Sequence, residues 1–195
     1  MSDRFVVYVL AEGKRDQRFI RKFLQGIGVG PREMTFAPIS DGRGSGKQSV
    51  LQSFADEVRA YRRRNSHTAT SLVVMMDADN QSVDRCLSDL DRKLVESGQE
   101  RVDRCSDRIA RLIPRRNIET WILYLVSGAL ARTQIREDDK GLKDTKSADA
   151  WDDAAPIAAA AFCEWYRFPS QRPAALLDSL DRGLRELPAA FPAKE

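Results

Sequence analysis

Short apolar runs alternate along the first part of the chain with segments of helical periodicity. Residues 5–10 (FVVYVL) and 71–76 (SLVVMM) are rich in β-branched and aromatic residues, which is typical of strands covered on both faces. Residues 107–114 (DRIARLIP) predict a further strand. Residues 34–40 (MTFAPIS) predict a weaker one, in which Pro38 indicates an edge strand or a strand end.

Apolar residues at helical spacing follow these runs. They are Phe19, Ile20, Phe23, Leu24 and Ile27 after residues 5–10, Val50, Leu51, Phe54, Val58 and Tyr61 after residues 34–40, and Val83, Leu87, Leu90 and Leu94 after residues 71–76. Residues 117–126 (NIETWILYLV) predict one more helix. The alternation favours an α/β fold in which an open, mostly parallel sheet is flanked by helices and joined by right-handed crossovers.

The pattern changes beyond about residue 130. Residues 136–153 are polar and mixed in charge, which favours an exposed loop or a lid. Two helices bounded by prolines are expected in the remainder. We therefore expect an α/β domain over residues 1–130 and, over 131–195, a polar loop with a C-terminal helical extension that packs on the domain or docks a partner.

Composition changes this picture little. Hydrophobic residues make up 42% of the 195 residues and charged residues 31%, which is ordinary for a globular protein, and the formal charge of +3 permits a polyanionic partner without requiring one. The three cysteines are scattered, which excludes a disulfide framework or a cysteine zinc site and favours a reducing cytoplasm. No stretch predicts a signal peptide or a membrane span.

Acidic residues follow two of the predicted strands. Ligands of open α/β sheets gather outside the carboxyl ends of the strands, where Glu12 and the pair Asp77 and Asp79 are expected. In an extended segment the two aspartates would point to one side, as a hard divalent cation requires, and a cation would relieve the repulsion among the three carboxylates. The alternative is that residues 77–80 form a turn that caps the next helix.

Two short motifs carry a resemblance to a known family. The sequence EGKRD (12–16) after a first strand, followed by DAD (77–79) after a later one, resembles the Toprim domain of topoisomerases, bacterial primases and several nucleases. The resemblance covers roughly residues 4–127. The segment RNIETWIL (116–123 with Arg115 before it) is similar, more loosely, to the corresponding segment of small stand-alone Toprim-like proteins of the OLD-nuclease type.

The resemblance implies a role for each matching residue. Glu12 would be a general acid/base or a metal ligand, and Asp77 and Asp79 would bind Mg²⁺ or Mn²⁺. Gly13 would let the backbone turn tightly, Lys14 would contact a phosphate, and Asp16 would support the site at the start of the helix. Independently, phosphodiester chemistry needs a metal that activates water and a carboxylate that handles a proton.

Glu119 lies in a helix that is apolar around most of its circumference, so its carboxylate needs a partner. An ion pair with Arg115 or Arg116 is one interpretation. The other is that Glu119 reaches the metal site as a further ligand.

Basic residues suggest phosphate contacts at two places. Residues 40–49 (SDGRGSGKQS) differ from a P-loop, which excludes ATP hydrolysis of that type, but their glycines would let backbone amides, Arg43 and Lys47 approach a phosphate. A plain connecting loop is the alternative. Arg115 and Arg116 are the best placed of the clustered arginines for a phosphate, although such clusters usually form solvated faces paired with acids.

The leading functional hypothesis is a Mg²⁺- or Mn²⁺-dependent nuclease of Toprim type that cuts DNA or RNA, with prokaryotic anti-phage defence as one setting that the resemblance implies. The alternative is a non-catalytic Toprim-like scaffold or regulatory subunit that binds a partner protein or nucleic acid. A separate ATPase subunit and a homo-oligomer are further partners to consider. A membrane is not.

Overall fold

The computed structural model describes residues 5–39, 46–66, 68–139 and 147–191. In chain order the elements are β1 (Val6–Ala11), α1 (Lys14–Gly26), β2 (Met34–Phe36), α2 (Gly46–Asn65), β3 (Thr70–Met75), α3 (Val83–Glu96), β4 (Ile109–Leu112), α4 (Ile118–Val126), α5 (Ala129–Arg132), α6 (Ala148–Arg167) and α7 (Asp178–Ala190).

The four strands form one sheet in the order β2-β1-β3-β4, and every neighbouring pair is parallel. All six residues of β3 are buried, as the apolar run predicted for a strand covered on both faces. The expected α/β class with helices flanking an open sheet is confirmed, and the arrangement is consistent with a Toprim-like fold.

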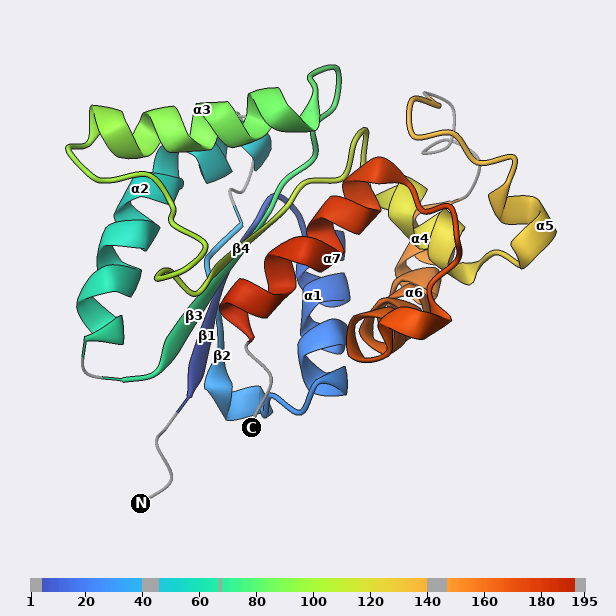
Figure 1. The fold of residues 1–195 in the computed structure, drawn as a ribbon, viewed down its shortest axis with the longest axis horizontal. Coiled ribbons are helices and arrows are strands. Elements are labelled where there is room, and N and C mark those ends of the chain that lie inside the picture. The colour runs from blue at the N-terminus through green and yellow to red at the C-terminus, as the bar shows by residue number, and fades with distance from the viewer. Residues whose placement is uncertain (1–4, 40–45, 67, 140–146, 192–195) are drawn as a thin grey trace.

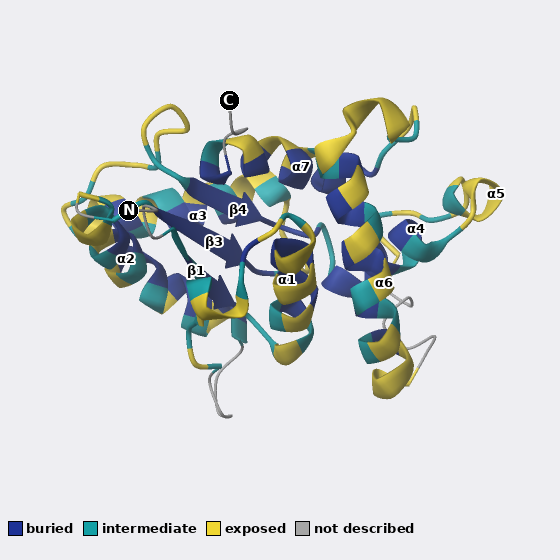
Figure 2. Ribbon diagram, turned by 90° about the horizontal axis from the view of Figure 1, so that it is seen from below, coloured by how far each residue is buried: buried dark blue, intermediate teal, exposed yellow. Residues whose placement is uncertain are grey.

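The sheet separates two apolar clusters (Figure 1). On one face α2 and α3 pack over residues such as Leu72 and Val74, while α1 and α7 cover the opposite face over Val73 and Met75. Figure 2 shows the buried strands between helices whose outer turns are exposed. The alternation of side chains along β3 therefore feeds both layers of the core.

The C-terminal helices belong to the larger of these clusters. α6 packs against α1 through the ring of Phe162, which lies 5.4 Å from Phe19 and 5.2 Å from Phe23 between centroids. α7 lies on the sheet, where the hydroxyl of Ser71 in β3 donates to the carbonyl of Ala190 at 2.6 Å. All three tryptophans are buried.

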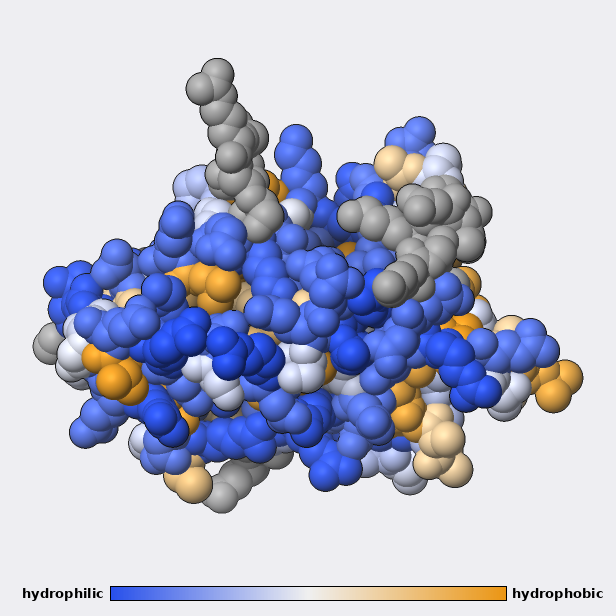
Figure 3. Space-filling view, turned by 90° about the horizontal axis from the view of Figure 1, so that it is seen from above, coloured by the Kyte–Doolittle hydropathy of each residue, from blue (hydrophilic) through white to orange (hydrophobic). Residues whose placement is uncertain are grey.

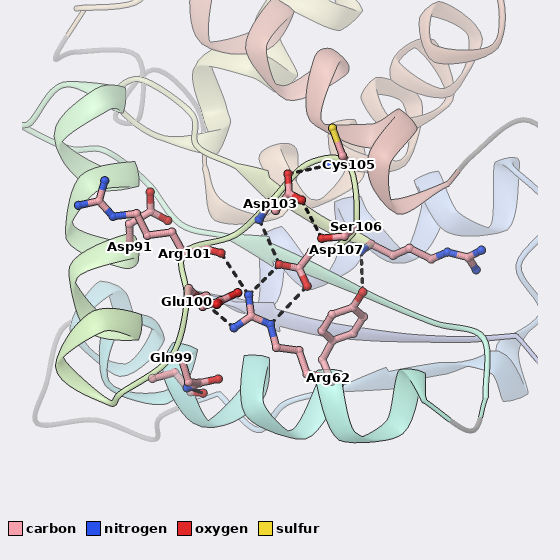
Figure 4. Close-up of polar contacts among 12 residues, drawn as sticks. Arg62, Asp91, Gln99, Glu100, Arg101, Asp103, Cys105, Ser106 and Asp107 are labelled. Atoms are coloured by element: carbon pink, nitrogen blue, oxygen red, sulfur yellow. Dashed lines mark hydrogen bonds and ion pairs between the residues drawn. The ribbon is translucent and has the colours of Figure 1, made fainter.

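Charged residues line the edge of the sheet that β4 forms. Glu186 of α7 is buried and pairs with Arg104 and Arg111, and its Oε2 also accepts the backbone N–H of Arg111 at 3.2 Å. On the other face Arg62 of α2 donates to Asp107 at 2.7 Å and to backbone carbonyls of the loop before β4 (Figure 4). These arginines are paired with acids, as clustered arginines usually are.

Three boundary predictions were wrong. β2 spans only three residues of the predicted seven: the N–H of Ala37 still donates to the carbonyl of Val9 at 2.8 Å, and Pro38, which has no N–H, then ends this edge strand, as its position indicated. Residues 148–153 are not loop but the start of α6, where the Ser147 side chain accepts the N–H of Ala150. Prolines bound the last helices only where Pro169 directly follows the C-cap of α6, because Pro156 lies within α6 and Pro188 within the last turn of α7.

Within the described residues, no helix is both long enough and apolar enough to cross a membrane.

Candidate functional site

Glu12 and Asp77 follow the two strands between which the strand order of the sheet reverses. From β1 the chain moves outward to β2, whereas β3 and β4 lie on the other side of β1, so the strand order reverses between β1 and β3. Crevices at such switch points, outside the carboxyl ends of the strands, are where α/β proteins bind ligands. Glu12 directly follows β1, and Asp77 follows β3 by two residues.

Backbone amides hold the Glu12 carboxylate at this switch point. Its Oε2 accepts the N–H of Asp77 at 3.0 Å, while the N–H of Glu12 donates to the carbonyl of Met75 at 3.1 Å. Burial raises the pKa of Glu12, Asp79 raises it further, and the amide of Asp77 together with the amide and ammonium of Lys47 opposes the rise. Glu12 is thus fixed in position, and its pKa is raised chiefly by burial.

The first turn of α2 touches Glu12 because residue 46 is a glycine. A β-carbon at Gly46 would lie 2.5 Å from both the Cγ and the carbonyl oxygen of Glu12, closer than any real contact. The N-terminus of α2 therefore directs its partial positive charge at the carboxylate. Residues 40–45 of the predicted glycine loop lie outside the described residues, the backbone amide of Lys47 hydrogen-bonds to Glu12, and the predicted phosphate contact of the loop stays a prediction.

Asp16 and Asp77 are the least satisfied acids of the site. Each has a buried Oδ1 without a hydrogen-bond partner, although part of Asp77 reaches solvent. Burial, followed by the charges of Glu12 and Glu119, raises the pKa of Asp16 to about 7. Burial, followed by the charges of Asp16, Glu12 and Glu119, raises the pKa of Asp77 well above its usual range. These carboxylates therefore share one electrostatic environment.

Asp79 does not extend the strand as predicted. Its φ of 56° is left-handed, a conformation that aspartate tolerates better than most residues, so the alternation expected for an extended segment fails. Its side chain is mostly exposed and lies 3.5 Å from the ammonium of Lys47, which also donates to the carbonyl of Ala78 at 2.8 Å. Lys47 is buried and ties α2 to the loop after β3.

Glu119 is buried at the start of α4, and its partner is neither Arg115 nor Arg116. It pairs with Arg15 of α1, which also donates to Asp152 of α6 at 3.1 Å and to the carbonyl of Ala148 at 3.3 Å. Glu119 therefore forms an ion pair with an arginine, as one interpretation predicted, but the arginine is Arg15 and not Arg115 or Arg116.

Arg115 and Arg116 instead brace the loop that carries the aspartates. Arg115 donates to the carbonyl of Gln81 and pairs with Asp138 at 2.8 Å. Arg116 donates at 2.8 Å to the carbonyl of Asp79 and to the side chain of Asn80. Their predicted phosphate contacts stay a prediction.

The remaining predicted residues lie in different settings. Gly13 is extended, with φ −146°, so a tight turn does not require glycine there; instead a β-carbon would lie 3.2 Å from an oxygen of Asp16. Lys14 is exposed at the start of α1, beside the site. Arg43 lies outside the described residues.

The donor set fits a hard divalent cation in its chemistry. Carboxylate oxygens are the preferred ligands of Mg²⁺, and Asp16 and Asp77 each offer an unpartnered one. Across the described ranges, however, no three acidic, histidine or cysteine side chains stand close enough together to hold a metal ion as they are placed. Side-chain rotation would have to complete such a site.

Sequence analysis missed two residues of the site, Arg15 and Gly46. Arg15 stands inside the EGKRD motif, but its partner Glu119 is 104 residues away and only the fold brings them together. Gly46 is the first residue of α2, and a glycine that opens a helix is a signal of close backbone approach.

No family model, curated protein or solved structure matches this chain.

Proposed function

We propose that this protein is a Mg²⁺- or Mn²⁺-dependent phosphodiesterase that cleaves DNA or RNA. The observation that carries the proposal is the pair of buried, unpartnered carboxylate oxygens of Asp16 and Asp77 at the switch point of the sheet. Keeping buried like charges together costs stability, so their retention favours a role in binding a cation. The EGKRD and DAD motifs, which resemble those of Toprim nucleases, support the same assignment.

Asp16 and Asp77 are the first candidates to hold the metal, with Asp79 and Glu119 as further candidates. A bound metal would lower the pKa of a water molecule and stabilise charge on the phosphate. Glu12 is suited to proton transfer, because backbone amides fix it in place and burial raises its pKa toward neutrality.

The test is calorimetric titration of Mn²⁺ and Mg²⁺ into the wild type, Asp77→Asn and Asp16→Asn, with cleavage of labelled DNA and RNA in the same buffers. We expect each substitution to weaken metal binding at least tenfold and to abolish cleavage. Asp56→Asn is the matched control, because Asp56 is an exposed acid of α2 whose only ion-pair partner within the described residues is Arg59. Unchanged metal binding in Asp77→Asn would overturn the proposal.

A second candidate function is a non-catalytic scaffold with the same fold. The observation that favours it is that Glu12 and Glu119 already have partners within the protein, so the acids need no metal to be partly compensated. A scaffold would bind its partner equally well with and without a chelator. Metal-dependent cleavage, alone or with a separate ATPase subunit, would exclude it.

A further inference from the structure

The charged side chains on the outward face of α1 are all cations, with the exposed amide of Gln25 beside them. Lys14, Arg18, Arg21 and Lys22 are all exposed, and at about 100° per residue they fall within an arc of about 100°. The one acid of the helix, Asp16, points to the opposite side, into the candidate site. We call these four residues the basic ridge.

The basic ridge forms one wall of a groove whose other wall is α6. Asp152, Asp153 and Pro156 line the α6 side. Asp152 pairs with Arg15 and, at 3.0 Å, with Arg18. Within the described residues Lys14 and Lys22 have no acidic partner at ion-pair distance, so the groove keeps uncompensated positive charge at both ends of the ridge.

The ridge starts at the candidate site and leads away from it. Lys14 is two residues from Glu12 and two from Asp16, and Lys22 lies about 12 Å farther along the helix axis at about 1.5 Å per residue. One strand of a nucleic acid has about 3.4 Å of helix axis per phosphate, so this length matches roughly three or four phosphates. The free α1 face is visible beside α6 in Figure 2.

The side chains that line the groove suit contacts to phosphates rather than to bases. No aromatic side chain lines its described part. The ring of Phe36, on β2, is covered by the guanidinium of Arg21 at 4.1 Å from the ring centroid. Recognition of a sequence needs contacts to base edges or stacking platforms, whereas lysines and arginines alone read the backbone.

We propose that the basic ridge binds the sugar-phosphate backbone of the nucleic acid beside the site, without regard to sequence. The inference rests on the proposed function for its orientation, since the ridge would deliver a phosphate to the carboxylates. It adds the surface that holds the substrate and the way the substrate is recognised. Figure 3 shows that the surface seen from above is mostly hydrophilic.

The test is binding of fluorescently labelled single-stranded DNA, duplex DNA and RNA in a chelator, measured by anisotropy over a series of salt concentrations. We expect Lys14→Gln and Lys22→Gln each to lower the slope of log affinity against log salt by about 1, and together by about 2. The loss should be equal for unrelated sequences. Arg101→Gln is the control, because Arg101 is an exposed arginine of the loop before β4, away from α1.

The outcomes separate this inference from the proposed function. Binding that depends on the ridge without any cleavage would support the ridge and count against the nuclease. Cleavage with salt slopes unchanged in the double variant would overturn the ridge and keep the nuclease. Binding of polyglutamate as tight as that of nucleic acid would also overturn it, because the surface would then favour an acidic peptide.

Discussion

Asp16 shows at the scale of one residue how the site bears on stability. Its pKa is about 7 in the folded protein against an ordinary 3.8, so the folded state holds a proton that the unfolded chain releases. The stability that this proton contributes is complete below about pH 4 and is lost as the pH rises through about 7.

We therefore expect Asp16→Asn, in a chelator, to raise the melting temperature more at about pH 8 than at about pH 5. About 1 kcal/mol corresponds to about 2–4 °C in a chain of this size, so a gain of several degrees is expected. Scanning fluorimetry across the pH range measures it, with Asp56→Asn beside it. A difference between variant and wild type that does not change with pH would contradict the assignment.

Arg15 is the second residue whose substitution should change the stability of the protein. Glu119 is 3% exposed, and removal of its partner leaves a buried charge uncompensated, which typically costs about 3–5 kcal/mol. We expect Arg15→Gln to lower the free energy of unfolding by that order, measured by urea denaturation. Arg15→Gln combined with Glu119→Gln should recover much of the loss.

Arg18→Gln provides the comparison for this prediction. Arg18 is about half exposed, and its pair with Asp152 is of the surface kind that contributes about 1 kcal/mol or less. Equal losses for Arg15→Gln and Arg18→Gln would show that Glu119 does not depend on Arg15.

At the scale of elements, the contact between α2 and β1 depends on Gly46. Alanine there would place its β-carbon 2.5 Å from Glu12, so either the helix start or the carboxylate must move. We expect Gly46→Ala to cost about 1–3 kcal/mol in stability, as overpacking does, and to weaken metal binding. Gly128→Ala is a matched control at the start of α5, because nothing lies within 4 Å of a β-carbon there.

The elements also show what the sequence could predict. The apolar runs predicted β1, β3 and β4 because burial on both faces leaves a continuous hydrophobic signal. The start of α6 was missed because residues 136–153 are mostly polar and the first turn of the helix is exposed apart from Trp151. Glu12 and Asp77 could be placed at strand ends from local pattern, whereas the partner of Glu119 could not, because it depends on how α1, α4 and α6 pack together.

At the scale of the whole molecule, the C-terminal helices complete the core. α7 buries Leu180, Leu184 and Leu187, and Trp121 of α4 donates to the hydroxyl of Ser179 at 2.8 Å. We expect calorimetry to show one unfolding transition for the full chain. A chain ending at Leu177 should aggregate or lose cooperative unfolding, because one face of β3 and β4 would be bare.

Two resolved transitions in the full chain would contradict this prediction. They would mean that residues 131–195 fold separately from the α/β domain.

The position of Glu186 has a consequence for how copies of this protein meet. β4 is the outermost strand on its side, and its outward-facing Arg111 amide would be a template for strand addition by another chain. Glu186 accepts that amide, and the Arg104 and Arg111 side chains hold the carboxylate in place. A strand from another copy would have to displace a buried ion pair before it could form a backbone hydrogen bond to Arg111. This edge of the sheet is therefore protected against strand addition by another copy.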